Sequence, residues 1–276
     1  MVSCPEPATF PLAYEWLGLV AGGCYCPIDG LWCAVYVMRW YCRFHFLSGM
    51  WLLVFLVRVA AIKVELDWTL DVFGIVAAPD SVDHNCNIIF NRTRDIHKES
   101  PCLTLTGPTR AVVAEDSVHF EVNLQVKGIT ESEDRCLCHL AVYYRDSGSS
   151  ESYMFKCIGT SKLSRVELVL GDMAKSVEAT ISVRVAGAGW PEGFRGVIFA
   201  NTTSIDGMKI ELLTFRDDKL PVTADGTIQL SRRVVSVEAD GELTVSVMAA
   251  CFDEHFGSSP SLGTSTVDAG LIYLEI

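Results

Sequence analysis

The stretch that decides the fold is Val118-His119-Phe120-Glu121-Val122-Asn123-Leu124-Gln125-Val126, in which every second residue is apolar. Successive side chains of a β-strand point to opposite faces of a sheet, so this alternation gathers the apolar residues on one face. The same alternation recurs at residues 177–185 and 243–247. The pattern predicts amphipathic strands whose apolar faces pack against one another.

Turn-forming residues separate these predicted strands. Asp-Gly pairs at residues 206–207, 225–226 and 240–241 are typical of hairpin turns. No stretch of helical length carries an apolar stripe with the helical period of about 3.6 residues. The sequence therefore predicts an all-β fold of about a dozen strands, stacked as an antiparallel β-sandwich.

Length and composition limit the class of protein. The chain has 276 residues, half of them hydrophobic, and a formal net charge of −12. Such a chain buries a sizeable core and does not have the composition of a disordered protein. An acidic protein is a poor ligand for a phosphate backbone, so we expect no nucleic acid among its partners.

The composition changes near residue 51. Residues 1–50 hold five of the eleven cysteines and three of the six tryptophans, but only five charged side chains. This segment breaks the strand pattern of the rest of the chain. We predict that residues 1–52 form a Trp/Cys-rich segment outside the core, and that residues 53–276 form the β-sandwich domain.

An apolar run at residues 44–62 allows two interpretations. Its first 14 residues carry no formal charge, whereas a helix that spans a bilayer needs about 20 apolar residues. Val57, Val59 and Ala61 alternate with other residues, as in a strand. A strand is favoured, and membrane contact through residues 44–62 stays an open alternative. The start of the chain has no signal-peptide pattern, so a cytoplasmic location is favoured.

Neither the spacing of the cysteines nor any familiar catalytic motif indicates a chemical activity in this sequence. Cys24-Tyr25-Cys26 and Cys136-Leu137-Cys138 lack the spacing of a zinc site. Cys136 and Cys138 are expected to share one face of a strand as reduced thiols, with disulfides or a metal site as less favoured alternatives. Nucleophile elbows, phosphate loops and His-Glu-x-x-His motifs are absent from the sequence. We therefore predict no catalytic residue and no cofactor.

One acidic loop offers a weak metal-binding alternative. Asp80, Asp83 and Asn85 place three oxygen ligands at close spacing, as in the calcium loops of C2-type sandwich domains. Further ligands would come from Asp217, Asp218 or Asp225. The favoured interpretation is an Asx-rich turn at a strand end, without a bound metal.

Several segments taken together resemble a known family. They are residues 70–78, 87–92, 105–113 and 118–126, with 176–180 and 225–247 towards the C-terminus. As a set, they resemble the plant family, abundant in grasses, that is catalogued as domain of unknown function 6598, over roughly residues 60–250. The resemblance implies an all-β domain with no assigned reaction. Some grass members occur with rRNA N-glycosylase-type domains, but the Glu-Ala-x-x-Arg signature of that activity is absent here.

These observations favour a non-enzymatic binding domain that acts through contacts with an unknown protein partner. A C2-like calcium or lipid-binding module and a hydrolase are the two alternatives. The architecture distinguishes them, because a pocket that gathers histidines and carboxylates indicates an enzyme. A flat sheet face or a free sheet edge indicates partner binding.

Overall fold

The computed structural model describes most of residues 51–251 and two strands of the N-terminal segment, 24–25 and 31–38, whose side chains are not described. Within 51–251 the gaps are 64–65, 67, 69, 80–85, 97–100, 115–116, 146–147, 186–193, 206, 216–219 and 239–240. All sheets of the described part are antiparallel, and its helical structure amounts to one 3-10 turn, η1 (Glu131–Glu133). The all-β prediction is confirmed.

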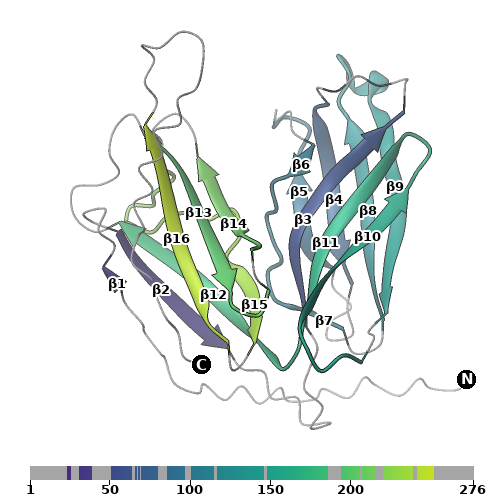
Figure 1. Ribbon diagram of the computed structural model, residues 1–276. Helices are drawn as coiled ribbons and strands as arrows, with labels where there is room; N and C mark the ends of the chain where they lie inside the picture. The colour runs from purple at the N-terminus through teal and green to yellow at the C-terminus, as the bar shows by residue number, and fades with distance from the viewer. Residues whose placement is uncertain are drawn as a thin grey trace, which may run out of the picture.

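The first half of the described chain forms two facing sheets (Figure 1). One sheet has the order β10-β11-β3-β6, with β7 also paired to β3, and the other has the order β5-β4-β8-β9. The strands are β3 (Trp51–Ile62), β4 (Val72–Ala78), β5 (Asn87–Arg92), β6 (Cys102–Leu103), β7 (Val112–Val113), β8 (Ser117–Val126), β9 (Arg135–Arg145), β10 (Tyr153–Thr160) and β11 (Ser164–Met173). Val118, Phe120, Val122 and Leu124 of β8 are buried between the two sheets, as their alternation predicts.

The second half, together with two strands of the N-terminal segment, forms another pair of sheets beside the first (Figure 1). Their orders are β1-β2-β12-β15 and β14-β13-β16. The strands are β1 (Cys24–Tyr25), β2 (Leu31–Met38), β12 (Ser176–Val185), β13 (Phe194–Thr202), β14 (Ile210–Phe215), β15 (Val234–Glu238) and β16 (Leu243–Cys251). Val177, Ala179, Ile181 and Val183 of β12 enter a separate hydrophobic core. The chain therefore has two packed sandwiches, where the sequence predicted a single one.

Part of the N-terminal segment takes part in the second sandwich. Strand β2 pairs with β12 from Glu178↔Met38 to Val185↔Leu31. This placement differs from the expectation that residues 1–52 stand apart from the sandwich. The run Leu31–Met38 is uncharged and rich in β-forming residues, but its lack of polar alternation hid the strand in the sequence. Where a domain boundary falls stays a prediction.

Strand β3 connects the two cores, because both of its faces are buried. Leu52, Val54 and Val57 pack into the first core, whereas Leu53 and Phe55 pack into the second. A register shift in the pairing with β11, at Val169/Leu170, inserts an extra residue between Val54 and Leu56. This two-sided burial explains the apolar run near residue 51, since alternation requires a solvated face. Among the described residues, no helix is long and apolar enough to cross a membrane.

Candidate interaction surface

The predicted metal loop lies outside the described residues, and so do its proposed partners Asp217 and Asp218. Asp225 is described and belongs to a turn, where its carboxylate accepts hydrogen bonds from the hydroxyl groups of Thr223 and Thr227. These bonds, the one from Thr223 first, hold the pKa of Asp225 well below its usual range. In the part of the chain that the structure describes, no group of three or more His, Cys, Asp or Glu side chains is arranged to hold a metal ion.

The paired cysteines of β9 do not share a face. A register shift beside Leu124 leaves Leu137 and Cys138 buried and Cys136 exposed. The prediction that Cys136 and Cys138 point to the same side is therefore wrong, because a β-bulge inverts the alternation at Leu137. Both are free thiols, and burial raises the pKa of Cys138 to about 11. Such a thiol is inert at neutral pH.

A buried polar network ties the two sheets of the first sandwich together. The Tyr144 hydroxyl donates to the Asp172 carboxylate and lies 3.1 Å from the Tyr153 hydroxyl. Burial, followed by the bond to Asp172, raises the pKa of Tyr144 above its usual range. Asp172 is only 1% exposed, so a substrate has no access to it. The network joins β9 to β11 and has a structural role.

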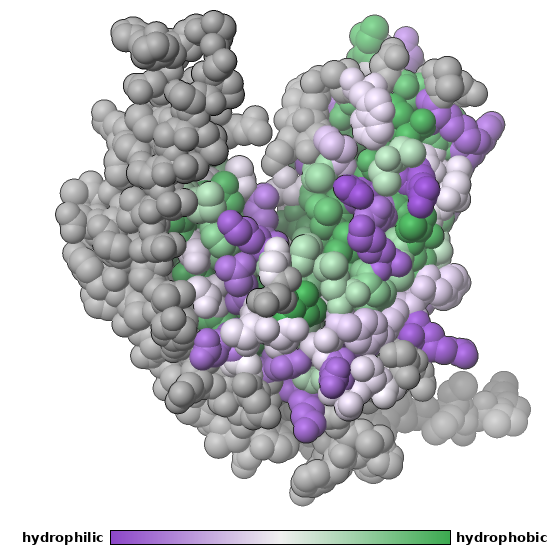
Figure 2. All heavy atoms as spheres, in the orientation of Figure 1, coloured by the Kyte–Doolittle hydropathy of each residue, from purple (hydrophilic) through white to green (hydrophobic). Residues whose placement is uncertain are grey.

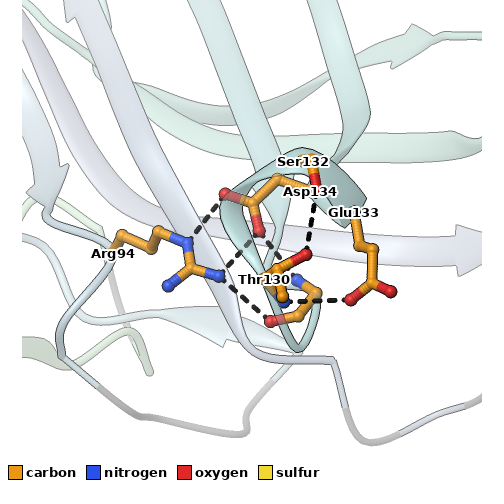
Figure 3. Close-up of polar contacts among 6 residues, drawn as sticks. Arg94, Thr130, Ser132, Glu133 and Asp134 are labelled. Atoms are coloured by element: carbon orange, nitrogen blue, oxygen red, sulfur yellow. Dashed lines mark hydrogen bonds and ion pairs between the residues drawn. The ribbon is translucent and has the colours of Figure 1, made fainter.

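A second polar cluster closes the loop between β8 and β9 (Figure 3). The Arg94 guanidinium donates to the two carboxylate oxygens of Asp134, at 2.8 and 3.1 Å, and to the Gly128 carbonyl, at 3.1 Å. Thr130 and Glu133 form a capping box around η1. A Cβ atom at Gly128 would lie 2.6 Å from the Cβ of Glu133, which explains the glycine. The polar groups of this cluster are used within it, so the cluster stabilises the loop.

An open groove of about 340 Å³ lies beside β3 and β6. Its lining residues are Arg58, Val59, Ala60, Trp68, Pro101 and Cys102. Arg58 Nη2 lies 3.1 Å from Glu167 Oε1, and Lys156 Nζ lies 3.3 Å from the same oxygen. Among the residues that the structure describes, this lining includes neither a histidine nor a carboxylate.

A buried carboxylate connects the two sandwiches. Glu178 on β12 is 4% exposed and accepts a 2.7 Å hydrogen bond from the backbone N–H of Ala111. Loss of water around the charged form raises the pKa of Glu178, and the bond from Ala111 offsets only part of that effect. The ionised form of Glu178 therefore lowers the free energy of unfolding at neutral pH.

Replacing this carboxylate by an amide tests the sign of the effect. Glu178→Gln keeps an oxygen for the Ala111 N–H and removes the buried charge, so we expect about 1 kcal/mol more stability at pH 7. The gain should shrink as the pH falls through the raised pKa towards 4.5, the ordinary value, because the wild-type carboxyl is then neutral too. Urea unfolding between pH 4 and 8 measures it. Glu211→Gln, on an exposed position of β14, is the control. Lower stability of Glu178→Gln at pH 7 would contradict the prediction.

The remaining candidate site is the outer face of the sheet β5-β4-β8-β9, which lies behind β3 and β11 in Figure 1. Ile75, Asn123 and His139 are neighbours in one row across β4, β8 and β9. His119 and Tyr143 form the next row but one, with ring centroids 5.9 Å apart. We call this surface the β4–β8 face. It is made of Ile75, Ile88, Asn91, His119, Glu121, Asn123, His139, Ala141, Tyr143 and Arg145.

The β4–β8 face exposes apolar area and little charge. Tyr143 is 73% exposed and Ile75 is 44% exposed. Glu121 is the one carboxylate of this set, with its Oε1 3.8 Å from His119 Nε2, and Arg145 is the one guanidinium. On the opposite sheet, where hydrophilic and hydrophobic residues are mixed over β3, β10 and β11 (Figure 2), Arg58 and Lys156 form ion pairs with Glu167. A sheet face that is poor in charge and carries an aromatic side chain has the composition of an interface core.

Sequence reasoning missed this surface, although one signal for it was present. Tyr143 and Ile75 are large apolar residues at strand positions that face away from the core. In an alternating strand, such a residue stands where a polar side chain is expected. The sequence does not show that β4 and β9 lie on either side of β8, so it does not show that these residues share one face.

The fold and this surface define an all-β protein with two antiparallel sandwiches and an exposed, charge-poor sheet face. The chain belongs to the family described as domain of unknown function DUF6598, which it matches over residues 51–268. The resemblance found in the sequence is thereby confirmed. No curated protein matches the chain.

Two solved structures share weak similarity with the chain. Human GIVD cytosolic phospholipase A2 in complex with methyl gamma-linolenyl fluorophosphonate is 10% identical, with a TM-score of 0.27, over 74% of this chain and 28% of that one. A second structure of human GIVD cytosolic phospholipase A2 is also 10% identical, with a TM-score of 0.27, over 84% of this chain and 29% of that one. The chain thus spans less than a third of the length of these structures, and similarity at this level supports no conclusion on fold or function.

Proposed function

We propose that this chain is a non-enzymatic binding domain that acts through protein contacts at the β4–β8 face. The observation that carries the proposal is the exposure of Tyr143, Ile75 and Ile88 on one sheet face in a protein with a net charge of −12. Exposed tyrosine supplies large contact area at a small cost in conformational entropy, and it is enriched among residues that dominate binding energy. The described lining of the open groove, with neither a histidine nor a carboxylate, is compatible with the proposal.

Affinity purification with two matched variants tests the proposal. Ile75→Lys places a charge in the β4–β8 face, and Ile158→Lys places the same charge on β10 in the opposite sheet. The two isoleucines are similarly exposed, at 44% and 47%. We expect the wild-type chain and Ile158→Lys to retain the same identified protein, and Ile75→Lys to lose it, because an unpaired charge in an interface core is costly.

The experiment is repeated with and without calcium, because the alternative C2-like module requires Asp80, Asp83 and Asn85. Retention that depends on calcium and is indifferent to Ile75→Lys would favour that alternative. A hydrolytic activity of the purified chain without any retained protein would contradict the proposal. Circular dichroism of each variant verifies that the strands are intact.

A further inference from the structure

We infer that the β4–β8 face is the contact between two copies of this chain. The inference rests on the proposed function, since it names the protein partner of the same face. Its first support is the size of the face. Four strands about 4.8 Å apart and ten residues of about 3.4 Å each along β8 give a footprint of roughly 600 Å². Stable interfaces bury about 800 Å² of accessible surface per partner, and side chains add to the flat footprint.

The distribution of charge supports a second copy as the occupant. Two chains of −12 repel each other, so a contact between them is least costly where carboxylates are few. On the β4–β8 face, Glu121 is balanced by Arg145, which lies opposite Ser117 at the end of β9. A two-fold contact requires that one face hold both members of each interacting pair. Among the described residues of this face, Glu121 and Arg145 provide one group of each sign.

The shape of the face points the same way. Two aligned sheets with similar twist pack about 10 Å apart in sandwich proteins, so an exposed sheet face is able to pack against its own copy. The opposite sheet of the same sandwich is unsuitable, because Arg58, Lys156 and Glu167 form an ion-pair cluster there. Such a cluster would be desolvated in a dimer. Of the two outer sheet faces of the first sandwich, the β4–β8 face is thus better suited to a second copy.

Sedimentation equilibrium of the full chain, loaded at ~1 and at ~100 μM, tests the inference. We expect twice the mass of one chain for the wild type and for Ile158→Lys, and the mass of one chain for Ile75→Lys. Tyr143→Ala should weaken the dimer at least tenfold, or about 1.4 kcal/mol, if Tyr143 is an anchor of the contact.

A single-chain mass at every concentration would overturn the inference, and so would a dimer that persists unchanged in Ile75→Lys. The outcome also separates the inference from the proposed function. If the wild type is monomeric but retains a different protein that Ile75→Lys loses, a second copy is the wrong occupant and protein binding at this face stands. If neither a dimer nor a retained protein is found, both fail.

Discussion

An aspartate at either Leu52 or Leu53 is expected to remove more than about 4 kcal/mol from the free energy of unfolding. The two side chains point to opposite faces of β3, and each is 1% exposed. Leu52 packs into the first core and Leu53 into the second. A carboxylate at either position loses its water without gaining an ion-pair partner, so both substitutions should be severe.

Urea unfolding of Leu52→Ala and Leu53→Ala gives the same comparison in chains that still fold. Each should lose between about 2 and 5 kcal/mol, the usual cost of truncating a buried leucine. Ile75→Ala is the control, because Ile75 lies on the exposed face of β4 and should change stability by no more than about 0.5 kcal/mol. If Leu53→Ala behaved like the control while Leu52→Ala did not, β3 would have one solvated face and the two sandwiches would not share it.

Strands β8 and β3 differ in how well their sequence patterns predict their burial. The alternation from Val118 to Val126 predicts the buried face of β8, because one side of that strand is solvated. The run from Trp51 to Phe55 has no alternation, since all five residues are buried between two cores. A pattern of this kind does not distinguish a strand with two buried faces from part of a buried or membrane helix. Tertiary packing of β3 decides between them.

The candidate surface is not predictable from strand patterns alone. Recognition of the β4–β8 face requires the order of β4, β8 and β9 in the sheet, which involves pairings between distant segments. Bulges make prediction from the sequence harder still, because each bulge exchanges the buried and exposed positions of a strand, as at Leu137 before Cys138. The lack of catalytic motifs in the sequence led to the prediction of a binding domain, but it gave no indication of which face would bind.

The position of Arg232 gives the second large expected effect. Its side chain is 1% exposed and belongs to the second sandwich, just before β15. Its guanidinium donates to the Val54 carbonyl of β3 and, at 3.2 Å, to the Val234 carbonyl. Val54 lies at the register shift of β3, where the ladder with β11 is interrupted. Arg232 thus binds a carbonyl at the bulge and joins the two sandwiches.

Two effects of opposite sign act on this arginine. Burial lowers the pKa of Arg232, because no carboxylate of the described residues compensates the loss of water around the charge. Its hydrogen bonds and its volume act in the other direction, since their removal takes a donor from each of two carbonyls and leaves a cavity between the sandwiches. We expect the contacts of Arg232 to outweigh the cost of its desolvation.

Arg232→Ala is therefore expected to lower the free energy of unfolding by about 3 kcal/mol. Arg232→Met keeps most of the volume and removes the buried charge, so its loss should be about 1 kcal/mol. Urea unfolding monitored by circular dichroism measures both variants against the wild type. A loss below about 1 kcal/mol for Arg232→Ala would show that relief of desolvation cancels the lost contacts. Equal losses for the two variants would show that the hydrogen bonds, rather than the volume, hold the sandwiches together. We therefore expect Arg232→Met to be clearly more stable than Arg232→Ala. A methionine fills the junction without a charge and so retains the packing between β3 and the second core.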